Sequence, residues 1–250
     1  MLSDYKIENL GSKIKICINN NHKFTTDTLL LANFSSQKKV KNALELCCGS
    51  GAISLIWHRD NIACNIYSVD IQPDACELLK ESVKINKIEK RLEVVNCDLK
   101  NIDKYIKGVR FDCIAVNPPY TTIGTGKTND DKSKLTARHE SECTIDDILR
   151  VSAKLLNFSG KFYICCRTHR LCEIMLTMKK YKIEPKQLQF VQQTKNKAPK
   201  LFLLQGIMGG KEFLNVMPTL IIQEDNGEYS EEMKRIYKDY FKENKRCLQN

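Results

Sequence analysis

The sequence predicts an α/β fold, with a mostly parallel, doubly wound sheet of seven strands and an antiparallel hairpin at one edge of that sheet. Two observations support this prediction. Between residues 43 and 180, short apolar runs alternate with helix patterns, as in repeated βαβ units. Beyond Pro185, two strand-like runs follow one another with only a short basic segment between them, which indicates a hairpin.

The first part of the chain, residues 1–36, is expected to form a short hairpin and one helix ahead of the core. Residues 13–18 alternate polar and apolar side chains, which is typical of a half-buried strand. Residues 19–21 are all asparagine and predict a turn. The leucine-rich run 27–34 predicts the helix.

In the core, each strand-like run is short, apolar and followed by a turn or a helix start. Pro73 and the Thr144 cap, with an acidic residue three positions later, each mark such a start. The predicted strands cover residues 43–47, 65–71, 92–97, 111–116 and 161–166, and the predicted helices cover 52–59, 73–83, 145–156 and 171–180. Edge strands are expected at 187–194, 201–205 and 217–223, before a last helix that begins near Ser230.

Acidic residues stand at the ends of three consecutive predicted strands: Glu45, Asp70 and Asp98. Because the carboxyl ends of parallel strands meet at one edge of a sheet, these side chains are expected to share a site. Asp70 can accept from both hydroxyls of a ribose. Asp98 can accept from an adenine amino group while Leu99 packs on the ring.

The turn after the first of these strands contains Gly49 and Gly51, which let the backbone approach a ligand closely. Glu45 precedes this turn, and a carboxylate there suits a cationic amino group better than a phosphate. S-adenosylmethionine has an α-amino group and a ribose but no phosphate. The sequence therefore predicts this cofactor, and it predicts no metal.

A second motif, Asn117-Pro118-Pro119-Tyr120, ends the fourth predicted strand, because two prolines in a row cannot continue a ladder. The Asn117 side-chain oxygen and the Pro118 carbonyl can each accept one hydrogen of a planar amino group. This aims the nitrogen lone pair at a methyl donor by positioning and electrostatics. Tyr120 can stack on a base that has left its stack, worth about 1–3 kcal/mol. These four residues are the predicted catalytic group.

Taken in order, residues 45–51, Asp70, Asp98 and 117–120 resemble the class I S-adenosylmethionine-dependent methyltransferases that act on planar amino groups. The runs 24–32, 137–140 and 190–220 are similar to the bacterial tRNA1(Val) N6-adenine methyltransferase family. This resemblance covers nearly the whole chain. It implies a Rossmann-like fold and methylation of N6 of the adenine 3′ of the anticodon, position 37, in a valine tRNA.

The same resemblance adds two residues to the cofactor site. It implies that Asp27 borders the methionine or substrate end of the pocket. Cys47 stands where such motifs often carry a first glycine, so a positive φ at Cys47 would strain the backbone. We expect one methyltransferase domain over 1–250, made of the extension 1–36, which borders the cofactor pocket, the catalytic core 37–223 and a C-terminal basic amphipathic helix, 224–250.

Composition bears on partners and location. The chain carries 40 Lys and Arg against 30 Asp and Glu, a formal charge of +10, which favours a polyanionic partner such as tRNA. The expected RNA contacts are the basic loop 124–140, the hairpin turn 195–200 and the C-terminal helix 230–246. Arg138 and His139 could either touch the substrate or only order the loop. No apolar run could span a bilayer and the start lacks an apolar signal segment, so we expect a cytoplasmic monomer without membrane contact.

Twelve cysteines occur without any Cys-x-x-Cys spacing, so we expect most of them to be small buried hydrophobes. Other functions stay open beside the main prediction. A glutamine-N5 methyltransferase acting on release factors would use the same motif on another planar amide, but the run before Glu45 does not resemble the helical domain of those enzymes. An N6-adenine methyltransferase acting on rRNA or DNA, and a non-catalytic RNA-binding module, are further alternatives.

Overall fold

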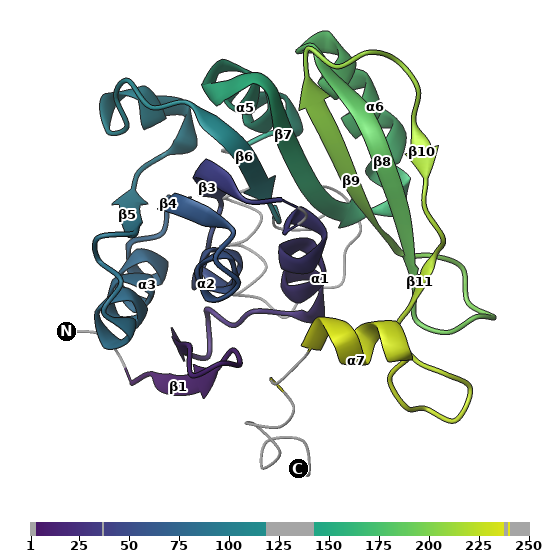
Figure 1. Cartoon of the computed structure of the whole chain (residues 1–250), viewed down its shortest axis with the longest axis horizontal. Helices are drawn as coiled ribbons and strands as arrows, with labels where there is room; N and C mark the ends of the chain where they lie inside the picture. Colours follow the sequence, from purple (N-terminus) through teal and green to yellow (C-terminus); the bar gives the residue numbers. More distant parts are fainter. Residues whose placement is uncertain (1–3, 37, 119–142, 238–239, 241–250) are drawn as a thin grey trace, which may run out of the picture.

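The computed structural model describes residues 4–36, 38–118, 143–237 and 240. It contains one large mixed sheet with helices on both faces, and a separate N-terminal hairpin (Figure 1). The strands are β1 (Lys6–Asn9), β2 (Lys15–Ile18), β3 (Val40–Leu46), β4 (Ala63–Asp70), β5 (Leu92–Asn96), β6 (Phe111–Val116), β7 (Leu156–Arg167), β8 (Ile183–Gln192), β9 (Leu201–Met208), β10 (Asn215–Val216) and β11 (Leu220–Ile221). The helices are α1 (Thr26–Ser35), α2 (Ala52–Arg59), α3 (Pro73–Asn86), α5 (Ile145–Leu155), α6 (Leu171–Lys180) and α7 (Glu231–Tyr237), with 3₁₀ helices η1 (Leu99–Lys104) and η2 (Thr168–Arg170).

The strand order of the large sheet is β10-β8-β9-β7-β6-β3-β4-β5, with β11 also paired to β8. β5, β4, β3, β6 and β7 run parallel to one another, whereas β9 is antiparallel to both β7 and β8. The predicted doubly wound sheet and its antiparallel edge hairpin are therefore confirmed, but the sheet has nine strands within the described residues rather than the predicted seven, because β10 and β11 pair with β8. The order reverses between β3 and β6, and this is where ligands bind in open α/β sheets.

Two hydrophobic clusters cover the two faces of the sheet. On β6, Cys113 and Ala115 belong to the cluster that includes side chains of α1, α2 and α3, whereas Ile114 and Val116 belong to the one that includes α5 and α6. This alternation follows from the two-residue period of a strand. Both faces are apolar because both are covered, as parallel sheets require.

The sheet edge differs from the prediction at residues 217–223. Instead of one strand, β10 and β11 each pair for two residues, and both run parallel to β8. Pro218 lies between them and has no N–H to donate, so a continuous ladder is interrupted there. β8 itself begins before Pro185, and its register shifts between Pro185 and Gln187.

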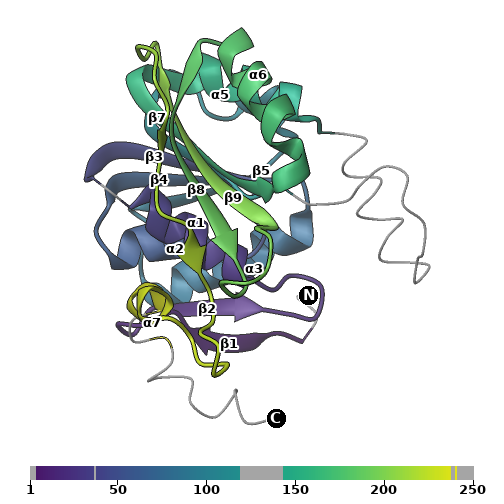
Figure 2. The same ribbon diagram turned by 90° about the vertical axis from the view of Figure 1, so that its right-hand side faces the viewer.

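The N-terminal hairpin β1–β2 docks on α3, as Figures 1 and 2 show. Ser82 Oγ on α3 accepts from the Cys17 N–H at 2.8 Å, and Asn86 Oδ1 accepts from the Lys15 N–H at 2.9 Å. Side chains of α3 thus satisfy backbone groups at the free edge of β2. The hairpin, like α1, is fixed to the core.

α7 packs its apolar stripe on the body as predicted, with Met233, Ile236 and Tyr237 buried. Phe241 and the rest of the predicted basic helix lie outside the described residues. Every cysteine within the described ranges is a free thiol, and Cys17, Cys97 and Cys113 are buried as expected. In the same part of the chain, no helix combines the length and the apolar character needed to cross a membrane.

Candidate active site

Four predicted motifs meet at one edge of the sheet, because β5, β4, β3 and β6 are parallel neighbours. Leu46 pairs with both Val69 and Val116, and Asp70 pairs with Asn96. The residues that follow these pairs, which include Asp98 and Asn117, therefore leave the sheet at the same end. Local sequence had placed each motif at a strand end, and the strand order brings the ends together.

The loop between β3 and α2 has an unusual backbone. Cys47, Gly49 and Gly51 have φ values of 53°, 51° and 77°. The positive φ at Cys47 confirms the backbone strain expected there, because a residue with a Cβ rarely adopts the left-handed conformation. A Cβ added to Gly51 would lie 2.3 Å from a methyl carbon of Leu79, and the positive φ would strain any other residue there. A Cβ added to Gly49 would meet nothing within 4 Å, which leaves that backbone open to a ligand.

Asp70 holds this loop against the end of β4. One of its oxygens accepts from the Gly49 N–H at 2.8 Å and the other accepts from the Gln72 N–H at 2.9 Å. The carboxylate is 5% exposed. Each carboxylate oxygen has a second lone pair, so these contacts leave room to accept from a ribose hydroxyl. That predicted ribose contact stays a prediction.

Glu45 lies beneath the loop and is 2% exposed. Its carboxylate accepts from the Ser54 N–H of α2 at 2.8 Å, where the helix N-terminus favours negative charge. Burial raises the pKa of Glu45 to about 7, against the opposing effect of the Ser54 hydrogen bonds. Glu45 thus joins β3 to α2. Its predicted interaction with a cationic amino group stays a prediction.

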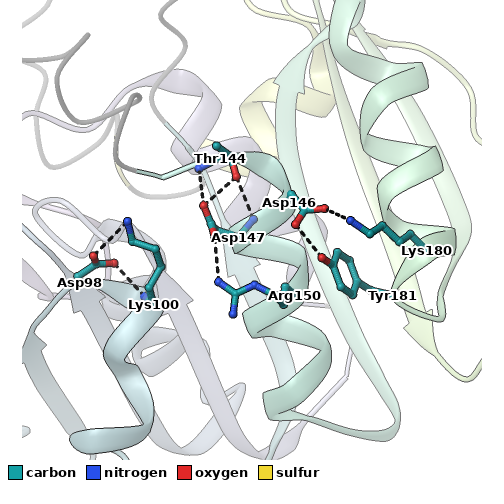
Figure 3. A network of polar contacts seen from close by, with 8 residues as sticks. All are labelled: Asp98, Lys100, Thr144, Asp146, Asp147, Arg150, Lys180 and Tyr181. Carbon is teal, nitrogen blue, oxygen red and sulfur yellow. Dashed lines mark hydrogen bonds and ion pairs between the residues drawn. The ribbon is translucent and has the colours of Figure 1, made fainter.

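Asp98 and Leu99 follow β5 and begin η1. Asp98 caps this helix by accepting from the Lys100 N–H at 2.9 Å, and its carboxylate pairs with the Lys100 ammonium at 3.4 Å. Figure 3 shows this pair facing the first turn of α5, where Thr144 and Asp147 form the predicted capping box. The Leu99 side chain is buried in the core cluster.

Two thiols meet between the glycine-containing loop and α5. Cys47 and Cys143 are in side-chain hydrogen-bond contact, which raises the pKa of Cys47 and lowers the pKa of Cys143. Sequence spacing alone does not indicate this contact.

Asn117 follows β6, with its side-chain amide against α1. Its Nδ2 donates to Thr28 Oγ1 at 3.2 Å. Thr28 follows Asp27 in the first turn of α1. That Asp27 borders the methionine or substrate end of the pocket stays a prediction. Pro118 is buried. Pro119, Tyr120, Arg138, His139 and the loop 124–140 lie outside the described residues.

Two residues of the N-terminal extension are near this site but were missed by sequence reasoning. Thr28 lies within the run 24–32, but no sequence pattern links it to Asn117, which is 89 positions away. His22 lies close enough to Asp70 and Asp74 for both charges to raise its pKa, although burial has the larger effect and lowers it. A histidine in an irregular segment carries no local signal of such proximity.

The donor set fits a sulfonium nucleoside. Carboxylates of Glu45, Asp70 and Asp98 stand at the three strand ends, and the loop 47–51 has no basic side chain. A phosphate cradle requires the opposite charge. The space around the Gly49 backbone allows a ligand to approach the loop closely. S-adenosylmethionine, with its ammonium, ribose and adenine, matches these groups.

Comparison with solved structures identifies the same fold. A protein from Agrobacterium tumefaciens, described as a predicted O-methyltransferase, superposes with a TM-score of 0.69 at 15% identity, over 85% of this chain and 95% of its own. Geranyl diphosphate C-methyltransferase from Streptomyces coelicolor, solved with S-adenosyl-L-homocysteine, gives a TM-score of 0.51 at 8% identity, over 72% and 76% of the two chains.

Sequence comparison finds curated relatives that match most of the chain. The tRNA1(Val) (adenine(37)-N6)-methyltransferase of Parabacteroides distasonis is 26% identical over 228 residues, which are 88% of this chain and 90% of that one. The protein of the same name from Flavobacteriaceae bacterium strain 3519-10 is 30% identical over 139 residues, which are 56% and 57% of the two chains. The family model described as the methyltransferase small domain matches residues 22–191. The chain therefore belongs to the methyltransferase small domain family.

Proposed function

We propose that this protein is an S-adenosylmethionine-dependent methyltransferase that methylates N6 of an adenine in tRNA, at position 37, 3′ of the anticodon of a valine tRNA. Family membership supports methyl transfer. The substrate is inferred from the curated relatives, which are named for this reaction.

The observation that carries the proposal is the contact between Asn117 and Thr28. Because Asn117 Nδ2 donates to Thr28 Oγ1, the amide is held in one orientation. An amide has its oxygen and nitrogen on opposite sides, so the oxygen faces away from Thr28 and can accept from an amino group. This orientation supports a role for the Asn117 oxygen as an acceptor of one hydrogen of an exocyclic amine.

The protein's part in the reaction is to orient the amine. The bound cofactor would supply an electrophilic methyl group. Asn117 Oδ1 and the Pro118 carbonyl would each accept one hydrogen of the adenine amino group, which favours a pyramidal nitrogen with its lone pair toward the methyl group. Tyr120 would stack on the base. Asp70 and Asp98 would hold the ribose and adenine of the cofactor.

RNA binding is proposed for the basic surfaces predicted from sequence. Lys195, Lys197 and Lys200 of the hairpin turn are exposed, and Lys195 is 3.6 Å from Glu224. Exposed pairs of this kind are weak and exchange readily for phosphate contacts. On α7, Lys234 pairs with Glu231 at 2.8 Å, so we expect this helix to contribute less than the turn.

The test is methyl transfer from labelled cofactor to total tRNA, total rRNA, DNA and release factor in parallel, followed by nucleoside analysis. We expect label in N6-methyladenosine of tRNA. Asn117→Ala is expected to lower methyl transfer by at least two orders of magnitude and to leave cofactor affinity unchanged, because it removes only the amine acceptor. Label in glutamine of the release factor, or near-normal turnover of Asn117→Ala, would overturn the proposal.

A further inference from the structure

A cavity of about 170 Å³ lies at the end of the sheet opposite the active site. It is bounded by the end of α1 and by the first residues of β3, β6 and β7. Cys113 lies in its wall, and Asn117 is four positions further along the chain, or about 13 Å of strand. A water occupies about 30 Å³, so the cavity can hold a ligand of several non-hydrogen atoms.

An irregular segment of β7 forms one wall. β7 pairs with β6 at Leu156, and regular pairing resumes only at Lys161, so residues 157–160 stand opposite the single residue Asp112. Ser159 has a φ of 64°, and a Cβ on Gly160 would lie 2.8 Å from the carbonyl oxygen of Asn157. Bulges of this kind are retained structural features that redirect side chains and often lie near sites. Here the bulge carries Phe158 to the mouth of the cavity.

Three lysines line the cavity: Lys38, Lys39 and Lys161. Lys161 is half-buried, and both its burial and the positive charge of Lys38 lower its pKa. Within the described ranges, no ion pair joins any of the three to a carboxylate. Two ammonium groups that repel each other in a partly desolvated cavity favour an anion between them.

Asp112 also lines the cavity, but its carboxylate is hydrogen-bonded to other groups than the three lysine ammonium groups. Asp112 Oδ2 accepts from the Lys41 and Asn42 N–H groups, each at 3.1 Å, and Oδ1 accepts from Asn157 Nδ2 at 2.7 Å. The carboxylate is thus committed to β3 and to the bulge.

Phe158 adds a second kind of contact. Its side chain is 79% exposed. One edge of the ring covers Gly209, where an added Cβ would lie 2.3 Å from a ring carbon. The rest of the ring is open beside the lysines. A cationic cavity next to an open aromatic ring matches a phosphate joined to a nucleobase.

We propose that this cavity is a second binding site, which takes the phosphate of a nucleotide between Lys38, Lys39 and Lys161, with the base on Phe158. An RNA chain and a free nucleotide share this chemistry. The +10 charge favours RNA, and the experiment separates the two sources. The site does not depend on the methyl-transfer reaction.

The first experiment uses inorganic phosphate and the full chain. The lysine side-chain NMR signals are followed as phosphate is added at constant ionic strength, in the wild type, Lys161→Gln and the matched control Lys41→Gln. Lys41 is an exposed lysine of the same region that does not line the cavity. A saturable upward shift in the pKa of Lys161, kept in Lys41→Gln, supports the site. No saturable response of Lys161 or Lys38 would overturn it.

The second experiment identifies the source of the phosphate. AMP and a short single-stranded RNA are compared by fluorescence competition at several salt concentrations. Loss of RNA affinity by about fivefold in Lys161→Gln but not Lys41→Gln, with a salt slope smaller by about 0.7, assigns the site to RNA. Loss of AMP affinity alone assigns it to a free nucleotide, and unchanged binding of both ligands would refute a nucleotide site. Phe158→Ala should weaken AMP but not inorganic phosphate, and equal AMP affinity would exclude the ring contact.

Discussion

Thr28→Val is the substitution that tests most directly how the catalytic amide is oriented. Valine keeps the shape and the β-branch of threonine but removes the oxygen that accepts from Asn117 Nδ2 at 3.2 Å and, at the longer distance of 3.5 Å, from the Thr25 N–H that begins α1. The amide then loses the hydrogen bond through which Thr28 sets its orientation. We expect a slower reaction with little change in the fold or in cofactor binding.

The expected loss in kcat follows from the hydrogen bond between Thr28 and Asn117. Such a bond contributes about 0.5–1.5 kcal/mol net. If that energy is lost from the productive orientation, kcat falls by about twofold to about tenfold, since 1.36 kcal/mol corresponds to a factor of ten. This loss is well below the one expected for Asn117→Ala, because the amide oxygen remains in the protein. Thr28→Ser, which restores an acceptor, should recover most of the activity.

The assay is single-turnover methyl transfer to the RNA substrate, with cofactor affinity measured by calorimetry and folding checked by thermal denaturation. Thr26→Val is the matched control, because the Thr26 hydroxyl lies in the same turn of α1 but contacts the Tyr237 hydroxyl at 3.1 Å. Wild-type kcat in Thr28→Val would refute the orienting role. An equal loss in Thr26→Val or in Thr28→Ser would show that the helix rather than the hydroxyl is responsible.

Three further predictions concern the cofactor loop. Asp70→Ala should weaken cofactor affinity at least tenfold, since it removes the acceptor of the Gly49 N–H as well as the expected ribose contact, and an unchanged dissociation constant by calorimetry would count against both. Gly51→Ala should lower the free energy of unfolding by about 1–3 kcal/mol, measured by denaturant titration, because its Cβ would overlap Leu79 at a positive φ. Glu45 has a folded pKa of about 7, above its unfolded value, so its stabilising contribution is complete below about pH 4.5 and is lost as pH rises through 7. Relative to Glu45→Gln, the wild type should lose roughly 3 kcal/mol of unfolding free energy over that range, and parallel pH profiles would contradict the buried carboxyl.

The agreement between sequence and structure is closest where the signal is local. Residues 111–116 form β6 as predicted. The apolar run favours a buried strand, and the two prolines that follow cannot donate to the ladder, so the strand ends before them. The Thr144 cap with Asp147 is likewise present in the structure, with Asp147 N–H donating to Thr144 Oγ1 at 3.1 Å. Both patterns involve residues within a few positions of each other.

Prediction was less complete where the chain departs from regular pairing. The strand expected at 161–166 begins five residues earlier, and the added part contains the bulge against Asp112. The segment 157–160, Asn-Phe-Ser-Gly, signals a turn by composition, but only its pairing partner decides whether it leaves the sheet or bulges within it.

The sequence by itself determined the alternating core and the acidic residues at successive strand ends, because hydrophobic period and turn chemistry act over short distances. Only the tertiary structure decided that α1 spans the sheet with Thr28 against Asn117 at one end and with its last residue, Ser35, in the wall of a lysine-lined cavity at the other. These contacts join residues far apart in the chain. They depend on strand order and on which helix packs on which face, and no local pattern encodes either.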